Sequence, residues 1–144
     1  MSFAEKQQIG WREWAALPEL SIKKIKAKID TGARTSALHA DQIEYFRRNG
    51  SDFVRFVVYP EQRNTGNIIR TEAPLLEKRN VKSSSGHSAE RPVIITRLKM
   101  GENEWPVELT LADRRLMGFR MLIGRQALMY RFIVDPSLSF VMQS

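Results

Sequence analysis

The chain has 144 residues, enough to bury one hydrophobic core, so a single domain is expected. It carries 23 lysines and arginines against 16 aspartates and glutamates, a formal net charge of +7 that either keeps the surface soluble or attracts an acidic partner. It has no cysteine, which excludes disulfides, thiolate metal sites and a cysteine nucleophile.

The N-terminal segment and the hydropathy predict a cytoplasmic protein with no membrane contact. Residues 2–8 contain charged side chains and no apolar run, unlike a signal peptide. No stretch approaches the roughly 20 apolar residues that a membrane span needs. We expect residues 1–144 to form one domain, in which residues 1–8 are a disordered N-terminus.

The region from residue 9 to residue 29 is predicted to form the first strands. Residues 9–20 carry Trp11 and Trp14 ahead of a proline, which indicates a strand or short turn leading into a loop. We expect the two tryptophans to pack in the core or at an interface rather than to stack on a ligand. A strand is predicted over 22–29, where isoleucine and alanine come to alternate with lysine, as on a strand with one buried face.

A hairpin is predicted next. One strand, bent at Asp41, covers 37–46, and an Asn-Gly turn joins it to a β-branched and aromatic strand over 53–59. Residues 60–70 are polar and indicate an exposed loop. Residues 71–80 have no clear pattern and are interpreted as extended.

The third quarter of the chain is predicted to contain a loop and the clearest hairpin. Residues 81–88 include three serines and a glycine, and because the run is short and lies between strands we interpret it as a mobile hairpin tip rather than a linker. Residues 93–100 and 105–111 form the hairpin, with Pro106 placing its strand at an edge or a bulge.

The C-terminal part is predicted to hold a buried strand over 121–123, one or two turns of helix over 125–130, and a last hairpin made of 132–134 and 138–141. Many short strands, one short helix and no long helical period indicate an all-β, barrel-like domain.

The chemistry-bearing motif follows the strand over 22–29. Residues 30–32 are Asp-Thr-Gly, a carboxylate and a hydroxyl beside a residue that permits a tight turn. The motif alone is weak, since many Asx turns have the same composition. It gains weight from the second apolar strand, 121–123, which runs into Gly124 and Arg125.

Four blocks of the sequence, at 10–14, 30–40, 81–87 and 117–125, together resemble the retropepsin-like aspartic peptidases. They are most similar to a bacterial and archaeal single-domain branch that is labelled ATP-dependent zinc protease and is found beside or fused to ATP-grasp ligases. The resemblance covers about residues 8–142. It implies a closed, barrel-like acid protease fold with one short helix near the C-terminus.

The resemblance also implies the roles of the motif residues. Asp30 is expected to be the catalytic carboxylate, Thr31 to clamp the partner loop and Gly32 to let the backbones approach. Ala33 is expected to support the site, and Gly124 to pack behind the loop. Aspartic proteolysis uses two carboxylates that share one proton, and the chain has one Asp-Thr-Gly. A working site would therefore need a homodimer that contributes two copies of the loop.

The same resemblance places a flap at the hairpin tip. Ser83, Ser84, Ser85 and Gly86 are expected to close over a bound peptide and exclude water. Retroviral members have a flap richer in glycine and isoleucine, so a more polar closure is expected here.

One position departs from the retroviral pattern. Arg34 stands where an acidic residue pairs with the arginine of the late Gly-Arg, which here is Arg125. Either both arginines face the cleft and recognise a carboxylate, which arginine binds bidentately, or each is tied to an acid such as Glu44 or Asp113.

The sequence argues against the zinc dependence and the ATP dependence that the family label implies. The two histidines, His39 and His87, have no His-Glu-x-x-His spacing and could form a site only if folding joined them. No phosphate-binding loop of the Gly-x-x-x-x-Gly-Lys type occurs, so ATP dependence would belong to a partner. We therefore expect no cofactor and no metal.

The leading hypothesis is an aspartic endopeptidase that acts as a homodimer, with acidic peptides or protein tails as substrates and an ATP-grasp ligase as a candidate partner. The alternative is a non-catalytic peptide-binding module that works with such a ligase. A basic β-barrel that binds nucleic acid is the poorest hypothesis, because no basic cluster is interleaved with aromatic residues as in a stacking platform.

Overall fold

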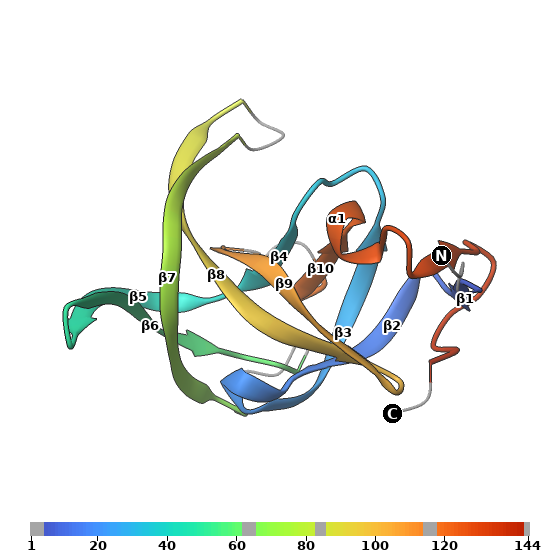
Figure 1. The fold of residues 1–144 in the computed structure, drawn as a ribbon, viewed down its shortest axis with the longest axis horizontal. Coiled ribbons are helices and arrows are strands. Elements are labelled where there is room, and N and C mark those ends of the chain that lie inside the picture. The colour runs from blue at the N-terminus through green and yellow to red at the C-terminus, as the bar shows by residue number, and fades with distance from the viewer. Residues whose placement is uncertain (1–4, 62–65, 83–85, 114–117, 143–144) are drawn as a thin grey trace.

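Strand β2 (Arg12–Leu17) pairs with β3 (Ile22–Asp30) on one side and with β8 (Ser88–Met100) on the other, and this double pairing closes a barrel of six strands within the described part of the chain (Figure 1). The computed structural model describes residues 5–61, 66–82, 86–113 and 118–142. In their order around the barrel, the strands are β2 (Arg12–Leu17), β3 (Ile22–Asp30), β10 (Met121–Gly124), β4 (Ser36–His39), β9 (Asn103–Ala112) and β8 (Ser88–Met100). The all-β, closed-barrel prediction is confirmed.

Beyond β8 the sheet continues as a wing of three strands, β7 (Ile69–Lys82), β6 (Ser51–Val58) and β5 (Asp41–Arg48). In Figure 1 this wing lies at the left of the barrel. The predicted bent strand is interrupted at Ala40 and forms two strands in the structure. The first, β4, belongs to the barrel, and the second, β5, belongs to the wing. Residues 71–80, which the sequence left ambiguous, lie in β7.

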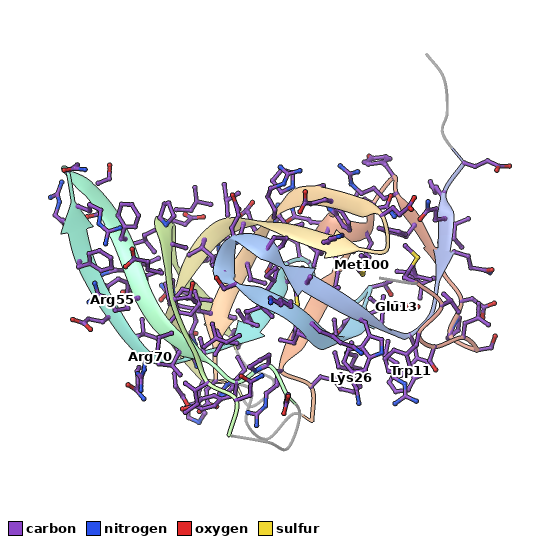
Figure 2. The ribbon with its side chains drawn as sticks, turned by 90° about the horizontal axis from the view of Figure 1, so that it is seen from below. Trp11, Glu13, Lys26, Arg55, Arg70 and Met100 are labelled. Atoms are coloured by element: carbon purple, nitrogen blue, oxygen red, sulfur yellow. The ribbon has the colours of Figure 1, made fainter. Side chains whose placement is uncertain are left out.

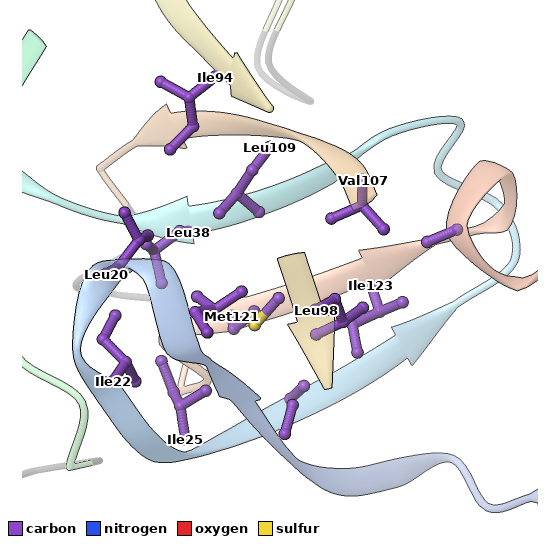
Figure 3. Packing of buried hydrophobic residues seen from close by; sticks show 14 of the residues in the cluster. Leu20, Ile22, Ile25, Leu38, Ile94, Leu98, Val107, Leu109, Met121 and Ile123 are labelled. Carbon is purple, nitrogen blue, oxygen red and sulfur yellow. The ribbon is translucent and has the colours of Figure 1, made fainter. Parts of the chain in front are cut away.

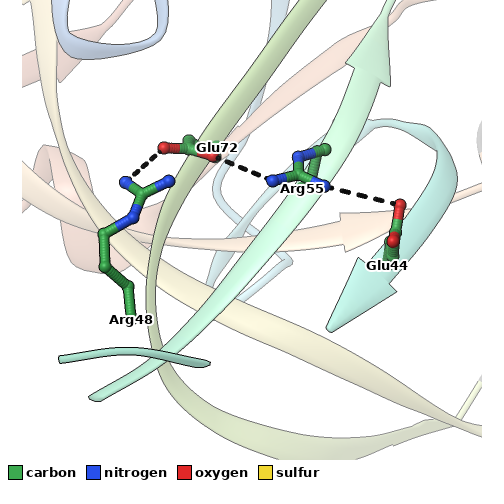
Figure 4. A network of polar contacts seen from close by, with 4 residues as sticks. All are labelled: Glu44, Arg48, Arg55 and Glu72. Atoms are coloured by element: carbon green, nitrogen blue, oxygen red, sulfur yellow. Dashed lines mark hydrogen bonds and ion pairs between the residues drawn. The ribbon is translucent and has the colours of Figure 1, made fainter. Parts of the chain in front are cut away.

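An ion-pair network links the three strands of the wing (Figure 4). Glu72 on β7 accepts a hydrogen bond from Arg48 at 2.6 Å and lies 3.7 Å from the guanidinium of Arg55. Arg55 also lies 3.8 Å from Glu44. These exposed pairs contribute little individually, but they place each of these four charges beside one of opposite sign.

Three short elements surround the barrel. β1 (Gln7–Ile9) pairs in parallel with β11 (Phe132–Val134), η1 (Pro18–Leu20) joins β2 to β3, and α1 (Arg125–Leu128) follows β10. The predicted last hairpin is wrong, because β11 pairs with β1 and residues 138–141 form no strand. Gln7 and Gln8, which were expected to be disordered, therefore lie in a strand.

Among the described residues, no helix is long and apolar enough to cross a membrane.

The barrel is filled by aliphatic side chains from all six strands (Figure 3). On β3 the alternation works as predicted, because Ile25, Ala27 and Ile29 point inward and are buried. Each fully buried leucine or isoleucine contributes about 1.5–3 kcal/mol to the stability. Trp11 and Trp14 are half-buried and lie outside this core, so of the two expected placements, core or interface, the core is excluded.

Candidate functional site

The Asp-Thr-Gly loop begins where β3 ends. The backbone N–H of Gly32 donates to Oδ1 of Asp30 at 3.0 Å, and the N–H of Ala33 donates to the Asp30 carbonyl at 3.2 Å. A Cβ added to Gly32 would lie 3.2 Å from the same carboxylate oxygen, so the close turn suits glycine. Asp30 is half-exposed and Thr31 is exposed. The carboxylate thus has a fixed orientation and access to solvent, as a general base acting on water requires.

Strand β10 supports the loop from behind. It runs parallel to β3, with Gly124 opposite Asp30 in the register. A Cβ added to Gly124 would lie 2.5 Å from the carbonyl oxygen of Thr35, which leaves no room for a side chain. The N–H of Gly124 donates to Oγ of the buried Ser36 at 3.1 Å. The sequence analysis missed Ser36, whose one signal was a hydroxyl placed shortly after the loop.

Arg125 holds the loop from its other side. Its Nη1 donates to the carbonyl of Gly32 at 3.2 Å and to that of Thr31 at 3.5 Å, and its backbone N–H donates to the carbonyl of Ala33 at 2.8 Å. The guanidinium therefore satisfies the backbone of the loop. Arg125 is exposed, so the remaining donors of its fork face outward.

Arg34 is exposed next to the loop, and no ion pair joins it to a carboxylate in the described part of the chain. The two acids considered as partners have other neighbours. Glu44 pairs with Arg55 in the wing (Figure 4), and Asp113 lies 3.8 Å from Nδ1 of His39. The positive charge of Arg34 is thus available to a ligand near Asp30.

The expected flap is the far end of the β7–β8 hairpin, where Lys82 pairs with Ser88. In Figure 1 this end and the loop between β3 and β4 both extend toward the top of the view. Gly86 is exposed and has a φ of 90°, a conformation that favours glycine. Ser83, Ser84 and Ser85 lie outside the described residues.

The two histidines have different environments. His39 is fully buried, with Nε2 at 3.9 Å from Asp41 and Nδ1 at 3.8 Å from Asp113, and its ring stacks on Tyr59. Burial lowers the pKa of His39 below the ordinary 6.5, against the opposing effect of Asp41. His87 is exposed. The described residues contain no group of three or more histidine, aspartate or glutamate side chains that could hold a metal ion.

Comparisons with known proteins agree with this geometry. A family model described as "Retropepsin-like aspartic endopeptidase RimB" matches residues 8–144. Proteins named "Probable alpha-L-glutamate ligase" from Desulfotalea psychrophila and Shewanella pealeana are 47% identical over 133 and 132 residues. Each match covers 92% of this chain and 29% of the relative, so the chain spans less than a third of the length of these proteins.

A solved structure has the same fold. The crystal structure of Lpg0085 from Legionella pneumophila, described as a protein with unknown function, aligns with a TM-score of 0.80 and 28% sequence identity, over 95% of this chain and 98% of that chain. Together with the Asp-Thr-Gly loop held by β10 and Arg125, the match over residues 8–144 identifies the chain: it belongs to the RimB-like family of retropepsin-like aspartic endopeptidases.

Proposed function

We propose that this chain is an aspartic endopeptidase of the cytoplasm that acts as a homodimer, with Asp30 as its catalytic carboxylate. The observation that carries the proposal is the oriented carboxylate of Asp30, which accepts the Gly32 N–H at 3.0 Å on a solvent-exposed loop. The loop is fixed by three elements of the fold: the end of β3, Gly124 of β10, and the guanidinium of Arg125.

The chemistry requires two copies of the loop. One Asp30 deprotonates the attacking water, and the second, which carries the shared proton, protonates the carbonyl oxygen of the scissile peptide. Two carboxylates at close range cannot both ionise readily, which keeps one proton between them. Each chain has one Asp-Thr-Gly, so a two-fold axis beside Thr31 would bring the second Asp30 into the site.

We propose acidic peptides or glutamate-rich protein tails as the substrates. The net charge of +7 favours such ligands, and the exposed Arg34 beside the loop supplies a fork of donors for a carboxylate. The similarity to proteins named as α-L-glutamate ligases is consistent with this choice, because a ligase of that kind would make glutamate chains. An ATP-grasp ligase is accordingly the partner that we propose.

The test is a cleavage assay on a glutamate-rich peptide at mildly acidic pH, with Asp30→Asn compared with the wild type. Asparagine keeps the shape of the side chain but cannot serve as the general base. We expect turnover to fall by about 100-fold or more, the contribution typical of general acid–base catalysis. Asp52→Asn is the matched control, because Asp52 is an exposed aspartate near the start of β6 that pairs with Arg47.

Asp52→Asn should cleave at the wild-type rate. Equal turnover by the wild type and Asp30→Asn would overturn the assignment of Asp30, provided that both proteins are folded by circular dichroism.

A second function has one observation in its favour. Relatives named as ligases contain a segment similar to 92% of this chain, and that segment makes up 29% of their length. In such a setting the fold could serve as a peptide-binding module without hydrolysis. Wild-type protein that binds a glutamate-rich peptide and never cleaves it would support this alternative over the endopeptidase.

A further inference from the structure

The outer surface of β3 is lined by lysines that lead to the Asp-Thr-Gly loop. Side chains on a strand alternate between two faces, and the inward face of β3 is apolar. Lys24, Lys26 and Lys28 therefore share the outward face with Asp30. Successive members of this row are about 6.6 Å apart, and the row from Lys24 to Asp30 is about 20 Å long.

The neighbouring strand adds to this positive surface. Arg12 of β2 lies directly opposite Lys28, and Trp14 lies directly opposite Lys26 (Figure 2, where Lys26 is labelled). Directly opposite residues of an antiparallel pair have their side chains on the same face. We call the surface formed by Arg12, Lys24, Lys26 and Lys28 the β2–β3 cationic face.

Aromatic rings of the C-terminal segment support this face. Phe140 stacks on Trp14 with ring centroids 5.3 Å apart, and the Arg12 guanidinium lies 4.7 Å from the Phe140 ring. The amino group of Lys24 lies 4.2 Å from the Trp14 ring. The cations are therefore held on a hydrophobic base, which limits the side-chain entropy that they lose when a ligand binds.

A buried carboxylate fixes the segment that carries Phe140. Glu13 of β2, labelled in Figure 2, has no exposed surface. It accepts backbone N–H groups from Gly10 at 2.7 Å, Val141 at 3.1 Å and Met142 at 2.9 Å. Strand β2 thus holds the C-terminal segment with Glu13 on one face and presents Arg12 and Trp14 on the other.

The lysines of this face lack acidic partners. Every ion pair in the described part of the chain uses an arginine or a histidine, and none uses Lys24, Lys26 or Lys28. Beside them is a pocket of about 580 Å³, lined by Lys24, Lys26 and Trp14 together with Glu61. Among the described lining residues, Glu61 is the one acid beside Lys23, Lys24 and Lys26, so positive charge predominates there.

We propose that the β2–β3 cationic face is a docking surface for an acidic polypeptide in extended conformation, which continues from the bond at Asp30 toward Lys24. The proposal rests on the proposed function for the identity of that polypeptide as the substrate. In an extended chain every second side chain lies on one face, at about 6.6–6.8 Å, so glutamates at alternate positions match Lys28, Lys26 and Lys24. About six residues on one side of the bond would cover the row.

The surface suits a peptide better than a nucleic acid. Single-stranded nucleic acids are bound by stacking their bases on aromatic rings. The Trp14 ring already stacks on Phe140 and carries Lys24 over it, so it is occupied by the protein's own side chains.

The test measures binding apart from cleavage. In the Asp30→Asn background, a fluorescent oligo-α-L-glutamate of about twelve residues, long enough to cover the row, is titrated at low ionic strength. We expect Lys24→Gln/Lys26→Gln/Lys28→Gln to weaken binding by about tenfold or more, the sum expected of three exposed ion pairs. A tetraglutamate cannot span the row, so its affinity should change less than twofold.

The matched control removes three positive charges elsewhere. Lys6, Arg47 and Lys78 are exposed residues outside β2 and β3, and their combined change to glutamine should leave the affinity within twofold. An equal loss of affinity in both triple variants would mean that only the overall charge of the protein matters. No loss of affinity in either variant would mean that the β2–β3 cationic face does not bind the peptide. Tighter, lysine-dependent binding of a single-stranded oligonucleotide of equal charge would overturn the peptide assignment.

The experiment distinguishes failure of the docking proposal from failure of the proposed endopeptidase function. If the wild type cleaves the peptide but the lysines do not affect its affinity, the docking proposal fails and the endopeptidase stands. If the lysines control affinity and the wild type never cleaves, the endopeptidase fails and the docking surface stands.

Discussion

Two carboxylates near the ends of neighbouring strands have opposite environments. Glu13 is buried and accepts three backbone N–H groups, so its oxygens are occupied by the protein. Asp30 is half-exposed, and the Gly32 N–H is its described side-chain partner. The difference in available lone pairs explains why Glu13 is structural and why Asp30 is suited to act on water or on a substrate.

The buried imidazole of His39 predicts how stability depends on pH. Because burial lowers its pKa in the folded state, the unfolded chain takes up a proton near pH 6.5 while the folded chain does not. The free energy of unfolding should therefore fall as the pH decreases from about 7.5 to about 5.5, across the ordinary histidine pKa. Among the described residues, Asp41, Asp113, Tyr59 and Arg120 are neighbours of the ring.

Urea unfolding of the wild type, His39→Gln and His87→Gln at both pH values measures this effect. His39→Gln should lose part of the pH dependence, whatever its own stability, while His87→Gln should retain it because His87 is exposed. The same pH dependence in His39→Gln as in the wild type would show that other groups cause it.

At the residue scale the sequence indicated the reactive group but not its support. Asp30 and Gly124 could be chosen because a strand end with Asp-Thr-Gly and a late Gly-Arg are visible as short patterns. Ser36 and Glu13 could not, because a single serine or glutamate acquires a role only from the backbone that folding brings to it. Their partners are 88 and 129 positions away in the chain.

At the scale of elements, the packing of β10 against the loop gives a further prediction. In Gly124→Ala the new Cβ would lie 2.5 Å from the carbonyl oxygen of Thr35 and 2.9 Å from that of Ala33. The loop must then move, which should cost about 1–3 kcal/mol of stability, as overpacking does, and should also displace Asp30. We expect cleavage activity to fall more than stability alone explains.

Ile123→Val is the control for that variant. It removes one methylene from the preceding core residue of β10, at a cost of about 0.5–1.5 kcal/mol, and adds nothing behind the loop. Activity measured well below both melting temperatures should be near the wild-type level in Ile123→Val and low in Gly124→Ala. Wild-type activity in Gly124→Ala would show that the loop tolerates the displacement.

The sequence predicted where strands lie better than it predicted which strands pair with each other. The alternation on β3 is confirmed. The prediction that Pro106 places its strand at an edge or a bulge is wrong for β9 as a whole, which lies between β8 and β4. Pro106 is tolerated because it lies in the part of β9 that pairs with β8 before pairing with β4 begins at Leu109. The prediction of a last hairpin is wrong, because segments that are adjacent in the sequence need not pair. Strand β11 pairs with β1, which lies at the other end of the chain. Local patterns identify strands, but they do not identify distant partners.

At the scale of the whole molecule, one chain provides one half of the proposed site. The barrel presents a single Asp-Thr-Gly loop, and in the proposed mechanism the second carboxylate of the dyad comes from another copy. In the wing, Glu44, Arg48, Arg55 and Glu72 pair with one another, whereas no ion pair in the described part of the chain uses a lysine of the β2–β3 cationic face. Catalysis and recognition would therefore depend on a dimer whose two cationic faces both lead to the shared pair of Asp30 side chains.

The most direct measurement of this central claim is the activity of mixed dimers. Wild type and Asp30→Asn are unfolded together in equal amounts, refolded, and assayed on the glutamate-rich peptide at constant total protein. If each site needs two Asp30 carboxylates, random pairing predicts about one quarter of the wild-type activity, because only that fraction of dimers has both. Activity at one half of the wild-type level would contradict the account, since it would mean that each chain cleaves with its own Asp30 alone.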